Sequence, residues 1–218
     1  MLIELENNVA ATTSNTGERL PHRPIILDIR NLTTEHEGII RNRISELNGC
    51  VTIFTHPYYG HERDEVDLHT DNQKYEHSNR IKDHIIRSSG VVFIFEGSND
   101  LDRTIFSTNL LQSNAIVVMV PTLNSRPTPQ HLDRREMSED EQWKDIIEKL
   151  YSFGVIDVTV GGRELYYKDG KPKGCVAMLV EQLITKFEVT IDENLSYPNT
   201  MHLSDLRLTG LTYAGLGV

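Results

Sequence analysis

The chain has 218 residues, of which 38% are hydrophobic and 25% are charged, and its 22 basic and 32 acidic residues give a formal net charge of −10. This length suits one domain with short appendages, and the apolar fraction is high enough for a packed core. The acidic balance argues against binding of a nucleic-acid polymer, which requires clustered lysine and arginine. No apolar run approaches the roughly 20 residues that span a bilayer, so no membrane attachment is expected. Two cysteines are too few for a disulfide framework, which favours a cytoplasmic location.

The first half of the chain predicts three strands with helices between them. Residues 1–22 are polar and without a regular period, so a flexible N-terminal arm is expected. The apolar runs that predict strands buried on both faces are 25–29, 51–54 and 91–95. A capping box of Thr34 with Glu37 predicts the start of the first helix, and Ser78 predicts the start of the second.

The second half continues the alternation. A helix is expected over 101–110, strands over 116–120 and 155–160, and a helix from Ser138 lies between those strands. Gly161-Gly162 predicts a two-residue turn, so that residues 164–168 pair back on the fifth strand. The remaining expected segments are a last helix over 175–186, a short edge strand at Val189 and Ile191, and a C-terminal tail over 193–218.

Continuous apolar strands that alternate with amphipathic helices indicate βαβ units and a mostly parallel sheet. Right-handed crossovers place helices on both faces of such a sheet. The predicted fold class is therefore α/β: a three-layer αβα domain over 23–192 with a mostly parallel five-stranded sheet, Rossmann-like or flavodoxin-like, and a late β-hairpin.

Ligands of open α/β sheets bind beyond the carboxyl ends of the strands. The second predicted strand is followed by His56, Tyr58, Tyr59 and His61, and the tyrosine rings could stack on a planar ligand. The same residues could equally form a packed loop with surface histidines. The histidine spacing matches no metal-binding motif, so no metal is predicted.

The end of the third predicted strand carries the densest group of functional side chains. Glu96, Asp100 and Asp102 are candidates for acid/base chemistry or for positioning hydroxyl groups. The candidate ligand-binding residues beside them are Gly97, Ser98, Asn99, Arg103 and Thr104. An ordinary helix cap is the alternative for this stretch. No phosphate-binding motif of the G-x-x-x-x-G-K-[ST] or G-x-G-x-x-G type occurs, and no cofactor is indicated.

Residues 78–122 resemble the nucleoside 2-deoxyribosyltransferase-like group of Rossmann-like proteins. That group has a helix, an apolar strand, a D-x-G-T-x-x-E loop and a second strand. Asp100 or Asp102, with Thr104, stands where the group has its Asp and Thr, and Ser107 stands where it has its nucleophilic Glu. The resemblance implies a nucleoside or nucleotide derivative as ligand.

A second resemblance is to the isochorismatase-like cysteine hydrolases. It covers ILDIRN at 26–31, FGVIDVTVGG at 153–162 and GCVAMLVEQL at 174–183. It implies that Asp28 is a base and Cys175 a nucleophile that attacks a carbonyl or imine carbon. No lysine matches the one of that family, because Glu96 ends the third strand. A buried structural cysteine at the start of a helix is the alternative reading of Cys175.

Three functions are therefore expected, in this order. The first is an α/β protein that binds a small molecule, with hydrolase or glycosyl-transfer chemistry open to it. The second is a cysteine hydrolase that uses Asp28 and Cys175. The third is an interaction module without catalysis that forms a homo-oligomer through its tails.

Overall fold

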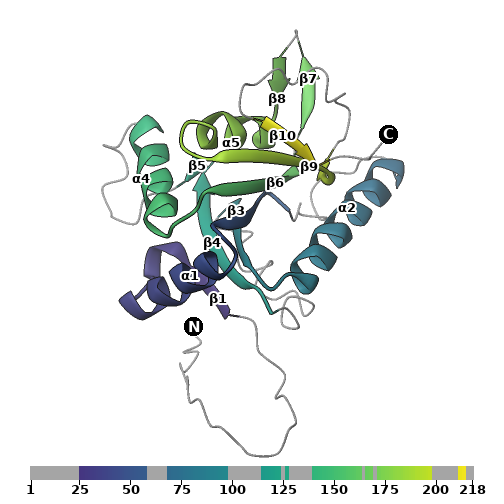
Figure 1. Cartoon of the computed structure of the whole chain (residues 1–218). Coiled ribbons are helices and arrows are strands. Elements are labelled where there is room, and N and C mark those ends of the chain that lie inside the picture. The colour runs from purple at the N-terminus through teal and green to yellow at the C-terminus, as the bar shows by residue number, and fades with distance from the viewer. Residues whose placement is uncertain are drawn as a thin grey trace, which may run out of the picture.

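A computed structural model describes residues 25–57, 68–97, 114–123, 126–127, 139–163, 165–168, 171–197 and 211–214. These residues build one open sheet in the order β1-β4-β3-β2-β6-β9-β10, with β5 paired to β4 (Figure 1). Every neighbouring pair along this path is parallel, and only β4 and β5 are antiparallel. The predicted α/β class is confirmed, with eight strands in the sheet where five were predicted.

The strands of this sheet are β1 (Ile25–Asp28), β2 (Cys50–Thr55), β3 (Val91–Gly97), β4 (Ile116–Leu123), β5 (Arg126–Pro127), β6 (Asp157–Arg163), β9 (Glu188–Tyr197) and β10 (Leu211–Ala214). The helices are η1 (Ile29–Asn31), α1 (Thr34–Glu46), α2 (Leu68–Arg87), α4 (Glu139–Ser152) and α5 (Cys175–Leu183). Strands β7 (Tyr166–Lys168) and β8 (Lys171–Lys173) form a separate antiparallel pair, which is not the predicted hairpin of the fifth strand with residues 164–168. No described helix has both the length and the apolar character needed to cross a membrane.

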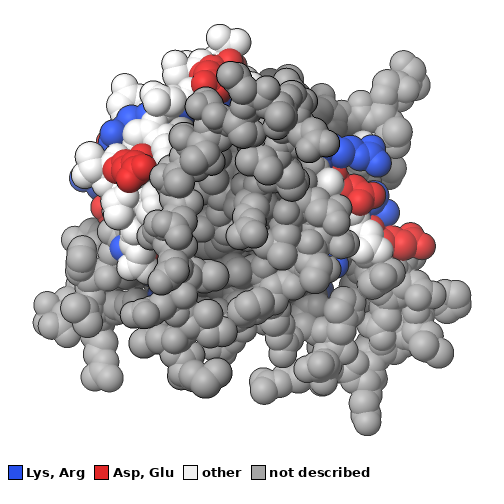
Figure 2. Space-filling view, turned by 90° about the horizontal axis from the view of Figure 1, so that it is seen from below, with Lys and Arg blue, Asp and Glu red and all other residues white. Residues whose placement is uncertain are grey.

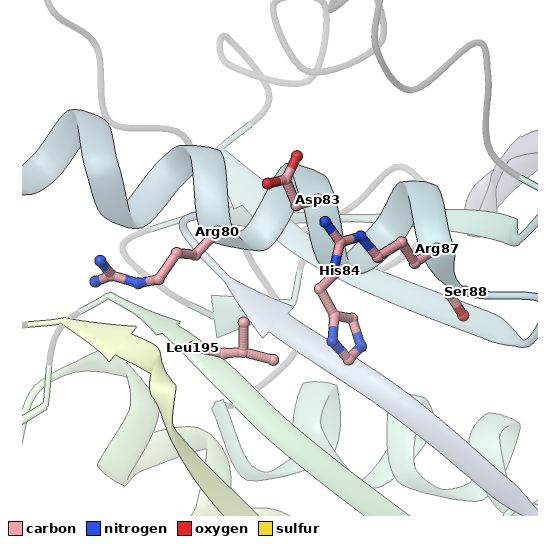
Figure 3. Close-up of a pocket in the computed structure, with 6 residues that line it drawn as sticks. All are labelled: Arg80, Asp83, His84, Arg87, Ser88 and Leu195. Atoms are coloured by element: carbon pink, nitrogen blue, oxygen red, sulfur yellow. The ribbon is translucent and has the colours of Figure 1, made fainter.

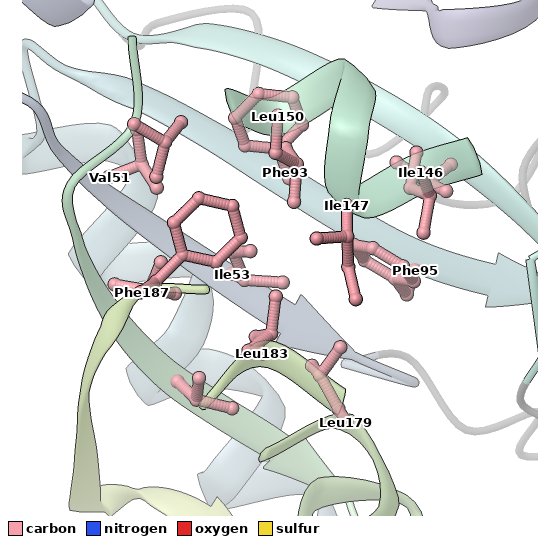
Figure 4. Packing of buried hydrophobic residues seen from close by; sticks show 14 of the residues in the cluster. Val51, Ile53, Phe93, Phe95, Ile146, Ile147, Leu150, Leu179, Leu183 and Phe187 are labelled. Atoms are coloured by element: carbon pink, nitrogen blue, oxygen red, sulfur yellow. The ribbon is translucent and has the colours of Figure 1, made fainter. Parts of the chain in front are cut away.

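Helices cover the two faces of the sheet unequally. Helices α1, α4 and α5 lie over one face and α2 over the other (Figure 1). On the first face, Ile53, Phe93 and Phe95 pack against apolar residues of α4 and α5 (Figure 4). On the second face, Val92 and Ile94 pack with Ile81 and Ile85 of α2. Alternate residues of β3 are thus buried on opposite sides, which explains the unbroken apolar run 91–95.

The turn predicted at Gly161-Gly162 is wrong. Both glycines lie inside β6, where they pair in parallel with Phe54 and Thr55 of β2. A Cβ atom on Gly162, whose φ is +122°, would lie 2.0 Å from the carbonyl oxygen of Thr55. The two glycines therefore serve the close approach of two strands rather than a chain reversal. Residues 166–168 pair with 171–173, not with the fifth strand.

Three further boundaries differ from the prediction. Helix α2 begins at Leu68, ten residues before the predicted start at Ser78. The prediction missed this first half because its residues are polar and show no apolar periodicity. The first helix is capped by Thr33 with His36 instead of Thr34 with Glu37. Strand β9 is not an edge strand, since it lies between β6 and β10, and part of the predicted C-terminal tail belongs to the sheet. The predicted arm over 1–22 and the helix over 101–110 lie outside the described residues.

The surface seen from below carries acidic and basic side chains side by side (Figure 2). The described part of this side shows no broad area of one charge sign. The described residues of this side therefore do not form the uniform basic field that attracts polyanions.

Candidate active site

His56 follows the last residue of β2 in an unusual backbone conformation. Its φ is +47°, in the left-handed region that residues other than glycine seldom adopt. Its N–H donates to the carbonyl oxygen of Phe95 at 2.8 Å, so the β2–β3 ladder holds it in place. Such conformations cost about 1–3 kcal/mol and cluster at functional sites.

Glu96 lies next to His56 because β2 and β3 are parallel neighbours. The register pairs Thr55 with Phe95, so the next residues of both strands emerge together at the carboxyl edge of the sheet. His56 Nδ1 and Glu96 Oε1 are 2.8 Å apart, and the side chains are 14% and 2% exposed. A carboxyl group buried to this extent requires hydrogen-bonding partners, and the imidazole supplies one.

Cys175 is the first residue of α5 and also contacts His56. The preceding Gly174 has a φ of +96° and accepts the first helical hydrogen bond from Met178 N–H at 3.1 Å. The N–H groups of the first turn therefore point past the helix start, where they favour negative charge. A hydrogen bond joins Cys175 to the imidazole of His56.

The two partners of His56 determine its charge. Burial alone lowers the pKa of His56, but hydrogen bonds and charge interactions with Cys175 and Glu96 outweigh burial and raise its pKa to about 10. The imidazole is therefore protonated at neutral pH. A cation beside a thiol favours the thiolate form of that thiol.

The structure brings together three of the residues singled out in the sequence: His56, Glu96 and Cys175. His56, which was expected to bind ligand, lies between the other two. Gly97 ends β3 and pairs with Thr122 of β4. The remaining candidates lie outside the described residues; they are Tyr58, Tyr59, His61, Ser98, Asn99, Asp100, Asp102, Arg103 and Thr104.

Asp28 is placed away from this group. It ends β1, and two strands, β4 and β3, lie between β1 and β2. Neighbouring strands are about 4.8 Å apart, so roughly 14 Å separates the ends of β1 and β2. Asp28 instead caps η1 and forms an ion pair with Arg30, with Oδ2 and Nη2 2.5 Å apart. The structure does not bring Asp28 and Cys175 together as base and nucleophile.

Within the described ranges, no group of three or more His, Cys, Asp or Glu side chains could hold a metal ion.

Comparisons with known proteins identify no family for the chain. No family model matches it, and no curated protein matches it. A solved structure that resembles it is the nicotinamidase of Staphylococcus aureus, with 11% identity, a TM-score of 0.39, and coverage of 68% of this chain and 82% of that chain. At this distance it assigns neither activity nor substrate.

Proposed function

We propose that this protein is a cysteine-dependent hydrolase in which Cys175 is the nucleophile, His56 is the acid/base and Glu96 is a positioning residue. The observation that carries the proposal is the contact of one buried imidazole with both a carboxylate and a cysteine at a helix start. A nucleophile, a base and a third group that orients the base is the arrangement required for covalent catalysis.

Each side chain has a defined task in the first half of the reaction. The Cys175 thiolate attacks a carbonyl carbon of the substrate, and the new S–C bond pushes charge onto the substrate oxygen. The N–H groups of the first turn of α5 stabilise this charge. Protonated His56 then donates its proton to the leaving group as the substrate bond breaks, which leaves a thioester and a neutral imidazole.

The second half restores the starting state. Neutral His56 takes a proton from water, and the resulting hydroxide attacks the thioester carbon. The S–C bond breaks, and the thiolate and the imidazolium are regenerated together. With Nδ1 engaged by Glu96, Nε2 is the ring nitrogen that serves both proton transfers.

Glu96 supports His56 in two ways. It accepts the Nδ1–H hydrogen bond, which fixes the tautomer and the ring orientation, and its charge stabilises the imidazolium. This use of Glu96 differs from the acid/base role expected from the sequence, in which Glu96 acts on the substrate directly.

The chemistry of the substrate is constrained only at its reacting centre. A thiolate and an imidazolium suit an amide or an ester. Among the described residues, nothing favours the nucleoside or nucleotide ligand implied by the first resemblance. Formation of a homo-oligomer through the tails is a separate proposal. The oligomeric state of a chain that lacks residues 1–20 and 196–218 tests it.

Reaction with p-nitrophenyl acetate tests the mechanism without knowledge of the substrate. The chain holds only two cysteines, so a Cys50→Ala background leaves Cys175 as the single thiol. We expect a burst of p-nitrophenolate, an acetyl adduct on Cys175 in mass spectra and then steady turnover. Cys175→Ser should lose the adduct, and His56→Gln should slow both phases by at least about tenfold.

Cys50 provides the comparison within the same chain. Burial and the neighbouring Asp157 carboxylate raise the pKa of the Cys50 thiol, so Cys50 should react slowly in a Cys175→Ser background. Equal acetylation rates for the two cysteines, or an adduct on Cys175 that never turns over, would refute the proposal.

A further inference from the structure

A pocket lies between α2 and the sheet, on the face opposite α5. Its volume is about 450 Å³, within the range of small-molecule sites. The residues that line it are Arg80, Asp83, His84, Arg87, Ser88 and Leu195 (Figure 3). Cys175 belongs to α5, which covers the other face, so this pocket is separate from the candidate active site.

The wall of the pocket is one face of α2. Arg80, His84 and Arg87 follow one another at spacings of four and three residues, which places them on the same side of the helix. Arg80 Nε donates to the carbonyl oxygen of Asn194 at 3.0 Å, which fixes the guanidinium at the edge of β9. Within the described chain Arg87 has no hydrogen-bond or ion-pair partner, although its charge also offsets the dipole at the end of α2.

The apolar residue that lines the pocket is Leu195. Leu195 is buried, and the ring of His84 meets the ring of Phe54 edge-on, with centroids 5.7 Å apart. Burial lowers the pKa of His84, against an opposing effect of Asp192. A neutral imidazole offers one hydrogen-bond donor and one acceptor.

The charges that line the pocket are unbalanced. Two arginines face one carboxylate, Asp83, in a chain whose net charge is −10. The guanidinium group presents planar, paired donors that match phosphate and carboxylate oxygens. Asp83 can accept a hydrogen bond from a hydroxyl or amino group on the same ligand.

We propose that this pocket is a second binding site, for a small ligand that carries a phosphate or carboxylate group together with a hydroxyl or amino group. Arg87 holds the anionic group, His84 adds a neutral hydrogen bond and Asp83 accepts from the ligand donor, while Arg80 adds positive charge at the other end of the pocket. Leu195 contacts the carbon skeleton.

Calorimetric titration of the full chain tests this proposal. The probes are glycerol 3-phosphate, inorganic phosphate and glutarate, with glycerol as the neutral match, all at constant ionic strength. We expect saturable binding of at least one anion with a Kd below about 10 mM, and none for glycerol. The phosphate and glutarate arms distinguish the two anionic groups.

Two variants locate the binding. Arg87→Gln removes a charge that no described residue uses, so the fold should be retained and the affinity should fall at least about tenfold. Lys144→Gln removes an exposed charge from α4, outside the pocket, and should leave binding unchanged. No saturable binding of any anion, or equal losses in the two variants, would overturn the proposal. The acetylation chemistry of Cys175 should be the same in both variants, so a failure here is distinguishable from a failure of the proposed hydrolase.

Discussion

The 2.8 Å contact between His56 Nδ1 and Glu96 Oε1 joins two adjacent strand ends at the carboxyl edge of the sheet. The Glu96 carboxylate is almost completely buried, and the His56 imidazole is mostly buried. Cys175, the first residue of α5, contacts the same imidazole from the helical layer that covers this face of the sheet. Three separate elements thus converge on one ring, which has both the charge and the position needed to activate a thiol.

Replacing Glu96 with Gln should slow the chemistry of Cys175. The amide oxygen can still accept the Nδ1–H hydrogen bond, but the charge that stabilises the imidazolium is lost, so the pKa of His56 should fall. Iodoacetamide alkylation of Cys175 at pH 6.5, in the Cys50→Ala background, should slow by roughly tenfold. Glu188→Gln, an exposed position on β9, is the matched control. An unchanged alkylation rate in Glu96→Gln would contradict the positioning role.

His56 should remain protonated far above the normal range of histidine. Its pKa of about 10, set by Cys175 and Glu96 against the effect of burial, predicts no titration of its ring between about pH 5.5 and 8.5. NMR of the histidine ring protons measures this directly, and the His56→Gln spectrum assigns the resonance. A midpoint near 6.5 for this resonance would show that the ion pair does not form.

The local elements were predictable from the sequence because burial leaves a clear pattern. The run 91–95 is apolar at every position because both faces of β3 are covered, and that pattern needs no knowledge of the rest of the fold. Gly161-Gly162 has two readings in a sequence, a turn or a close strand contact, and only the pairing with β2 decides between them. The polar first half of α2 leaves no apolar stripe to detect.

Which candidate residues lie close together depends on the order of the strands in the sheet, and that order could not be predicted from the sequence. The positions of His56, Glu96 and Cys175 at strand ends or a helix start were predictable one by one. Which of them meet is set by the order β1-β4-β3-β2, which puts two strands between Asp28 and β2 and brings Glu96 beside His56. The pocket wall of Arg80 and Arg87 was not predicted at all, because the two side chains line one pocket only when α2 packs against β9.

His77 should make the protein less stable in mild acid. It is 3% exposed, and its Nε2–H donates to the carbonyl oxygen of Leu195 at 3.0 Å. Burial, with smaller effects from Arg80 and Arg163, lowers the pKa of His77 to about 4. Because the unfolded chain takes up this proton near pH 6.5, its contribution to stability is complete above that pH and is lost as the pH falls toward 4.

Urea unfolding of the wild type and of His77→Gln measures this effect. Glutamine can still donate to Leu195 but does not titrate, so the wild type should lose roughly 3 kcal/mol more than the variant between pH 7.5 and 4. The difference between the two proteins should be constant above about pH 7.5. A constant difference over the whole range would mean that His77 does not titrate below its normal pKa.

Gly162→Ala should destabilise the fold strongly. A Cβ atom there would lie 2.0 Å from the carbonyl oxygen and 2.6 Å from the nitrogen of Thr55, and these are backbone atoms that cannot rotate away. The φ of +122° adds conformational strain. We expect a loss of at least about 3 kcal/mol in the free energy of unfolding, measured in urea.

Gly154→Ala separates the effect of the steric clash with Thr55 from the effect of a positive φ. Gly154 also has a positive φ, +88°, but nothing lies within 4 Å of the position its Cβ would take, so this variant should lose only about 1–2 kcal/mol. If the two variants lose the same stability, close approach of β6 to β2 is not the reason for the glycine. Because Thr55 precedes His56, the Gly162→Ala clash should also displace the imidazole. Alkylation of Cys175 should therefore slow in the folded Gly162→Ala protein and remain unchanged in Gly154→Ala.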